Sequence, residues 1–202
     1  MKSKATDTYQ EYARKIGDRK VLYEVVTKKF NIQVALYPGS HIDIAPSIVI
    51  PTVTYMDNFK GAIRFFNDID EIEEYIEQNK EYLDKSEISF LGQDYTTPFD
   101  IKEVDLIISQ YAGFVGQATK QALKTGGILL CNDSHGDASL AKLDEDYEFI
   151  GIVNSQKEIE TEHLEDYFVL PKEKSIDRKL VEQKMKGLKY KKNAENYLFR
   201  KV

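Results

Sequence analysis

The chain has 202 residues, 42% of them hydrophobic, and a formal net charge of -6 at pH 7. This length suits one full core and is short for two independent ones, so we expect one main domain. No apolar run approaches the roughly 20 residues that cross a bilayer, and the first residues are polar rather than an apolar signal segment. We therefore expect a cytoplasmic protein with no membrane partner.

The single cysteine, Cys131, excludes an internal disulfide and a cysteine-cluster metal site. It lies in the apolar run at 127–131, which favours a small buried hydrophobic residue over a nucleophile.

The charges are unevenly distributed along the chain. Residues 172–202 carry 11 Lys/Arg against 4 Asp/Glu, whereas residues 1–171 carry 17 against 30. Such a basic segment could contact nucleic acid or an anionic surface. It could equally pack its charges against the acidic body or form a solvated face, and we favour these latter alternatives.

Two amphipathic helices are predicted within residues 1–31. Apolar residues recur at the spacing of one helix face, first at Tyr9, Tyr12, Ala13 and Ile16, and then at Leu22, Val25, Val26 and Phe30.

The remainder of the chain alternates short apolar runs with amphipathic segments. The pattern predicts strands at 32–37, 52–56, 87–91, 104–109 and 128–131. It predicts helices at 59–66, 70–83 and 115–124, the last closed by Gly126 and Gly127. Runs at 147–153 and 167–170 are joined by polar residues without a helix-sized apolar stripe, which favours an antiparallel pair.

This order predicts an α/β fold. Alternating strands and helices require right-handed crossovers, which gives a doubly wound, mainly parallel seven-stranded sheet with helices on both faces and a last antiparallel strand pair. Ligands of such sheets bind at the carboxyl ends of the strands. We expect a main domain at residues 1–171, with the N-terminal helices at 1–31, and a basic helical extension at 172–202.

Several loops carry a family resemblance in their order and spacing. Asp57 and Asn58 follow the second predicted strand, and Asp94 and Tyr95 follow the third. The fourth strand reads Val-Asp-Leu-Ile-Ile-Ser at 104–109. With the glycine pair before the fifth strand, residues 21–170 resemble the class I S-adenosylmethionine-dependent methyltransferase-like (Rossmann-like) family, whose strand order is 3-2-1-4-5-7-6.

The resemblance implies S-adenosylmethionine as cofactor. By this similarity Asp57 would hold the ribose hydroxyls, and Asn58 directly after it is also a candidate cofactor contact. Asp94 would lie beside the adenine, with Gln93 and Tyr95 flanking the ring, and Ser109 would lie near the transferred methyl group.

The loop after the first strand departs from the family pattern. The family has an acidic residue on this strand and several glycines after it, because glycine lets the backbone approach the cofactor. Here Tyr37 and Pro38 precede a single glycine, Gly39, and Ser40 follows. We expect Tyr37, Gly39 and Ser40 to be the contacts that this degenerate first motif supplies.

Tyr111 and His135 are the catalytic candidates. Tyr111 follows the fourth strand and could contact a methyl acceptor or cover the end of the sheet. His135 could act as a base oriented by Asp133 or Asp137, although Asn-Asp-Ser at 132–134 is also a good turn and capping sequence. We predict no metal site; a set of His41, Asp43, His135 and Asp137 would need distant loops to meet.

Two functions remain open at this stage. One is a methyltransferase of unknown acceptor with a small-molecule ligand, in which a nucleic acid partner is possible but not favoured. The other is a non-catalytic binding or regulatory module whose cofactor pocket is filled by Tyr37 and Pro38. We also predict that deletion of residues 172–202 leaves the sheet folded.

Overall fold

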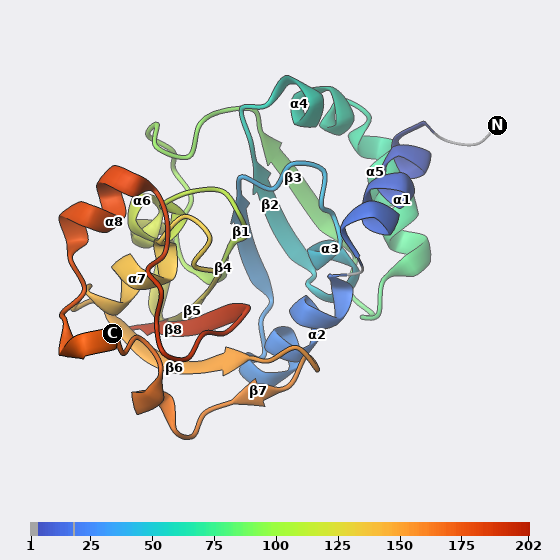
Figure 1. Ribbon diagram of the computed structural model, residues 1–202. Helices are drawn as coiled ribbons and strands as arrows, with labels where there is room; N and C mark the ends of the chain where they lie inside the picture. Colours follow the sequence, from blue (N-terminus) through green and yellow to red (C-terminus); the bar gives the residue numbers. More distant parts are fainter. Residues whose placement is uncertain (1–3, 18) are drawn as a thin grey trace. The chain divides into compact units, whose positions relative to one another are not determined.

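The computed structural model describes residues 4–17 and 19–202. The chain divides into two units, Met1–Thr97 and Pro98–Val202, and each is described separately below (Figure 1). Within the described residues, no helix combines the length and the apolar character needed to cross a bilayer.

The first unit consists of three parallel strands and five helices. In chain order its elements are α1 (Lys4–Ile16), α2 (Lys20–Phe30), β1 (Val34–Pro38), α3 (Pro46–Val49), β2 (Thr52–Met56), α4 (Lys60–Phe66), α5 (Ile69–Asn79) and β3 (Glu87–Leu91). The strand order is β3-β2-β1. The two predicted N-terminal helices and the strand bounds 52–56 and 87–91 are confirmed.

The core of the first unit is rich in aromatic side chains. Tyr23, Tyr37 and Tyr55 are fully buried. Phe66 stacks on Phe90 with 4.3 Å between ring centroids, so α4 is held against β3 by ring packing. This packing fixes the loops at the carboxyl ends of the strands.

The second unit begins with a parallel pair and ends with antiparallel strands. Its elements are β4 (Val104–Ser109), α6 (Val115–Ala118), η1 (Lys120–Ala122), β5 (Leu123–Cys131), α7 (Asp137–Lys142), β6 (Tyr147–Val153), β7 (Ile159–Glu160), η2 (Leu164–Asp166), η3 (Pro171–Glu173), α8 (Arg178–Lys184) and β8 (Asn196–Lys201). The strand order is β4-β5-β8-β6-β7, with β8 lying between β5 and β6 (Figure 1).

The α/β fold and the methyltransferase-like strand order are confirmed, with eight strands among the described residues instead of the expected seven. The identity of the strand beside β5 is a correction. Residues 167–170 do not form a strand, and the end of the chain supplies β8 instead. Phe168 has φ +61°, which interrupts an extended conformation. Segment 172–202 is helical only in part. Because it supplies β8, which pairs with both β5 and β6, the structure does not support the prediction that deletion of residues 172–202 leaves the sheet folded.

The predicted helix at 115–124 is also corrected. The structure has only the four-residue α6 and a single 3₁₀ turn, and β5 begins at Leu123. Gly126 has φ +80°, and the register between β4 and β5 shifts between Val104 and Leu106. The glycine pair therefore lies in an irregularity of β5 rather than at a helix end.

Candidate functional site

The loop after β1 is tied to the end of β2. The Gly39 N–H donates to the Met56 carbonyl at 2.7 Å, and the chain then turns through positive φ at Gly39 (+65°) and His41 (+50°). The His41 N–H donates to Asp57 Oδ2 at 2.8 Å, and the Phe59 N–H donates to Asp57 Oδ1 at 2.7 Å. The Asp57 carboxylate therefore organises both loops.

The ends of β2 and β3 meet through a side-chain hydrogen bond. Asn58 Nδ2 donates to Asp94 Oδ2 at 2.9 Å. The Thr96 hydroxyl and N–H donate to Asp94 Oδ1 and lower the pKa of this carboxyl. Asp57, Asp94 and Tyr95 are all half-buried. Four of the predicted cofactor residues, Asp57, Asn58, Asp94 and Tyr95, thus lie at adjacent strand ends of the first unit.

Aromatic rings flank this edge. The His41 ring stacks on the Phe59 ring with 5.5 Å between centroids, and Tyr12 lies 5.1 Å from His41. Phe59 is 56% exposed. Phe59 and Tyr12 were not among the predicted contacts. The Asp-Asn-Phe string directly after β2 could have indicated Phe59, because it places this ring at the same strand end as Asp57.

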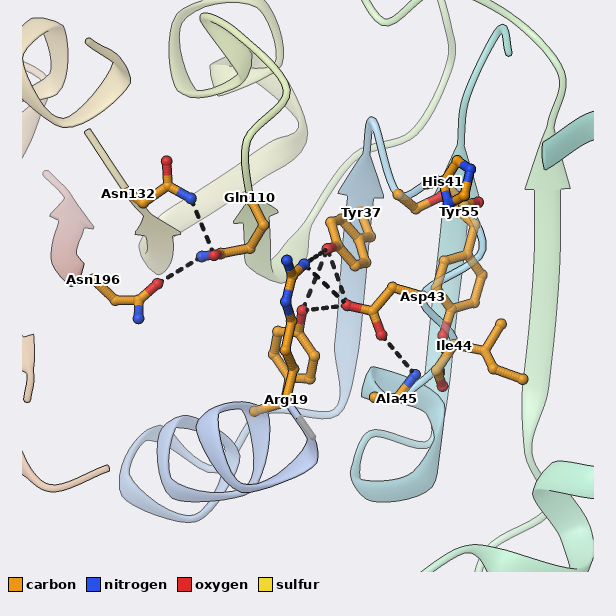
Figure 2. A network of polar contacts seen from close by, with 12 residues as sticks. Arg19, Tyr37, His41, Asp43, Ile44, Ala45, Tyr55, Gln110, Asn132 and Asn196 are labelled. Atoms are coloured by element: carbon orange, nitrogen blue, oxygen red, sulfur yellow. Dashed lines mark hydrogen bonds and ion pairs between the residues drawn. The ribbon is translucent and has the colours of Figure 1, made fainter. Parts of the chain in front are cut away.

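Tyr37 and Ser40 lie inside the first unit, each 1% exposed. The Tyr37 hydroxyl donates to Asp43 Oδ2 at 3.2 Å, and the Tyr23 hydroxyl donates to the same oxygen at 2.8 Å. Arg19 Nη1 completes the cluster at 3.5 Å from this oxygen (Figure 2). Burial raises the pKa of Asp43, and Arg19 and the tyrosine hydroxyls act in the opposite direction. Tyr37 is therefore held inward by a polar cluster of the core.

Ser109 at the end of β4 is fixed by a buried carboxylate of the second unit. Its hydroxyl donates to Asp137 Oδ2 at 2.5 Å, and the Gly116 N–H donates to the same group at 3.0 Å. Burial raises the pKa of Asp137 to about 7, and the bond from Ser109 acts in the opposite direction. Ser109 and Asp137 are 2% and 1% exposed, so this pair joins β4 to the start of α7.

A chain of amides runs beside this pair. Asn132 Nδ2 donates to Gln110 Oε1 at 3.1 Å, and Gln110 Nε2 donates to Asn196 Oδ1 at 2.8 Å (Figure 2). The ends of β4 and β5 are thus linked to the start of β8.

The carboxylates of the loop at 132–137 do not orient His135. Asp133 accepts the Ser139 N–H at 2.7 Å and the Ser139 hydroxyl at 2.8 Å, and burial raises its pKa to about 6. The polar partner of His135 Nδ1 is the Ser134 hydroxyl at 3.0 Å. The turn and capping interpretation of this loop therefore accounts for Asp133.

A pocket of about 300 Å³ opens beside this loop. Tyr111, Asn132 and Ser134 line one side, and residues 186–188 and 193–195 of the C-terminal segment line the other. Tyr111 is 59% exposed and has φ +59°. In the part of the chain that the structure describes, no group of three or more His, Cys, Asp or Glu residues could hold a metal ion.

No protein-family model and no curated protein matches this chain. Among solved structures, TehB from Haemophilus influenzae is 16% identical with a TM-score of 0.52, covering 88% of this chain and 60% of that chain. A methyltransferase from Geobacter sulfurreducens is 12% identical with a TM-score of 0.49, covering 74% and 83%. The N-methyltransferase NodS from Bradyrhizobium japonicum WM9, in complex with S-adenosyl-L-homocysteine, is 15% identical with a TM-score of 0.42, covering 67% and 77%.

At these identities the likeness concerns the fold alone. Together with the strand order, it gives this chain a class I methyltransferase-like fold.

Proposed function

We propose that the protein is an S-adenosylmethionine-dependent methyltransferase whose cofactor binds at the carboxyl ends of β1, β2 and β3. The observation that carries this proposal is the Asn58–Asp94 hydrogen bond of 2.9 Å beside the half-buried Asp57. It brings the two acidic residues that the resemblance assigns to ribose and adenine to adjacent strand ends.

The side chains at this edge fit the nucleoside part of such a cofactor. Ionised carboxylates accept hydrogen bonds from ribose hydroxyls, and each carboxylate oxygen has capacity beyond one donor. The exposed Phe59 ring offers a face on which adenine could stack. Asp57, Asn58, Asp94 and Tyr95 would therefore hold the nucleoside, with Gly39 allowing close backbone approach.

The other predicted contacts fit less well. Tyr37, Ser40 and Ser109 are buried, and the hydroxyls of Tyr37 and Ser109 donate to Asp43 and Asp137. Tyr37 and Ser40 would therefore support the site from the core of the first unit rather than touch the cofactor, and the Ser109 hydroxyl is already engaged within the second unit.

The bound cofactor supplies a methyl group on a positively charged sulfur. The protein then needs mainly to place an acceptor in line with that bond and to exclude water. We propose that Tyr111 contacts the acceptor and that His135, with the Ser134 hydroxyl on Nδ1, takes up the proton that the acceptor loses.

Titration calorimetry with S-adenosylhomocysteine tests the cofactor site. Hydrogen bonds to charged groups contribute roughly 1.5–3 kcal/mol, so Asp57→Asn should weaken binding about 10- to 150-fold. Asp84→Asn is the matched control, because Asp84 is an exposed aspartate that precedes β3 at the opposite strand ends. Absence of heat with the wild-type protein at millimolar ligand, or equal affinity of the two variants, would contradict the proposal.

The second candidate is a binding module without methyl transfer. Each oxygen of Asp57 already accepts a backbone N–H. The buried Tyr37 and Pro38 also form the end of β1, where the family has a glycine-lined turn. If loop organisation is the whole role of Asp57, Asp57→Asn lowers the melting temperature and the wild-type protein gives no heat with S-adenosylhomocysteine.

A further inference from the structure

The C-terminal segment before β8 is strongly basic. Residues 172–192 hold nine Lys/Arg and three Asp/Glu, a net charge of +6 in a chain whose total is -6. All eight of its lysines are exposed and lie at 172, 174, 179, 184, 186, 189, 191 and 192. The Lys192 ammonium lies 4.4 Å from the centroid of the Tyr167 ring.

Acidic side chains of the second unit do not pair with these charges. Among residues 98–171, all of which the structure describes, no Asp or Glu forms an ion pair with a Lys or Arg of this segment. The ion pair within the segment is Arg178–Glu182 at 3.7 Å. Within the second unit, the exposed lysines agree with the solvated-face alternative.

The segment is nonetheless fixed to the second unit. The Gly187 N–H donates to the Asp133 carbonyl at 3.0 Å, and the Tyr190 hydroxyl lies 2.5 Å from the Ser139 hydroxyl. A Cβ on Gly187 would lie 2.1 Å from that Asp133 oxygen, so the backbone of the segment approaches the loop as closely as glycine permits. The lysines thus project from an ordered backbone.

Three of the lysines line a hollow of about 860 Å³ beside α8. They are Lys172, Lys174 and Lys189, and the lining also holds the carboxylate of Asp177 and apolar side chains that include Leu188. Leu188 also lines the 300 Å³ pocket that contains Tyr111. The hollow with three lysines and the small pocket with the exposed Tyr111 ring are therefore neighbours that share Leu188, although Asp133 and Glu195 also line the pocket.

We propose that this face binds a single-stranded nucleic acid, with phosphates on Lys172, Lys174 and Lys189 and one base in the pocket beside Tyr111. Lysines neutralise phosphates without sequence preference, and unstacked bases bind by stacking on aromatic side chains. The proposal names the acceptor class and so rests on the proposed function, but the binding itself requires no cofactor.

Fluorescence anisotropy with a labelled 12-nucleotide single-stranded RNA of mixed sequence, without S-adenosylmethionine, tests this binding. The variant Lys172→Gln, Lys174→Gln, Lys189→Gln removes three phosphate contacts. It should bind at least 10-fold more weakly at 50 mM salt. It should also reduce the slope of log affinity against log salt by about 2, because each contact on a single strand contributes roughly 0.7.

The matched control replaces three exposed lysines of the first unit, Lys29, Lys60 and Lys85, by glutamine. It changes the net charge equally and should retain the wild-type slope. Equal loss in both triple variants would overturn the proposal, because overall charge would then explain the binding. Binding of the wild-type protein to phosphatidylserine vesicles but not to the RNA would also overturn it.

Tyr111→Ala tests the base pocket. It should weaken binding of the RNA roughly 5- to 150-fold, the effect of one base–aromatic stack, and Tyr111→Phe should retain the affinity. Equal affinities of the two variants would refute the placement of a base beside Tyr111. Because the RNA assay contains no cofactor and the calorimetry contains no RNA, failure of this inference is distinguishable from failure of the cofactor proposal.

Discussion

Phe199 in β8 offers the sharpest test of the unexpected strand. Its ring is 0% exposed, and β8 is paired with β5 through Leu129 and with β6 through Phe149. The ring centroid lies 5.3 Å from that of Phe149 and 6.1 Å from that of Phe168. Phe199→Ala therefore leaves a cavity, because the strands paired on both sides of β8 hold the neighbouring side chains in place.

Truncation of a buried phenylalanine costs about 3–5 kcal/mol of unfolding free energy. For a chain of this length, 1 kcal/mol shifts the melting temperature by roughly 2–4 °C, so a decrease of about 6–20 °C is expected. Urea denaturation followed by circular dichroism measures the change, and Val202→Ala is the control because Val202 is 59% exposed. A loss below about 1 kcal/mol for Phe199→Ala would refute the placement of β8 in the core.

Two further predictions concern the second unit. Gly187→Ala should destabilise it by about 1–3 kcal/mol through a clash with the Asp133 backbone. Gly92→Ala is the control, because its Cβ would make ordinary contacts of 3.5 Å, and it should change the melting temperature little. Equal effects of the two substitutions would contradict the close approach of Gly187 to Asp133. The second prediction concerns Asp137, whose pKa burial raises to about 7. The folded protein therefore holds this proton more tightly than the unfolded chain does. The resulting stabilisation is complete below about pH 4 and is lost as the pH rises through 7. The melting temperature should therefore decrease more between pH 5 and pH 8 for the wild-type protein than for Asp137→Asn. Equal decreases in the two proteins would show that this carboxyl titrates normally.

Most strands were predictable because their apolar runs are continuous and bounded by turn residues. Residues 104–109 illustrate this, since Leu106, Ile107 and Ile108 are all buried. β8 was not predicted because the apolar run at 197–199 is short and is followed by Arg200 and Lys201, so it reads as part of a basic tail. Conversely, the apolar residues at 167–170 suggest a strand, but Tyr167 and Phe168 instead pack into the aromatic cluster around Phe149.

The candidate site was predictable where it depends on strand ends alone. Parallel strands that pair in register bring the residues after them together, and the Asn58–Asp94 hydrogen bond follows from that geometry. The inward position of Tyr37 could not be predicted, because it depends on Tyr23 of α2 and on Arg19, which share Asp43 with it. The partners of Asp133 likewise arise from the contact of residues 186–190 with the loop after β5.

Hydrogen–deuterium exchange with and without saturating S-adenosylhomocysteine tests the central claim most directly, because it reports both binding and its location. If the cofactor binds at these strand ends, exchange should become slower at the backbone amides of residues 57–60 and 94–97, where the loops after β2 and β3 would close on the nucleoside. Unchanged exchange in both loops at millimolar ligand would contradict this claim.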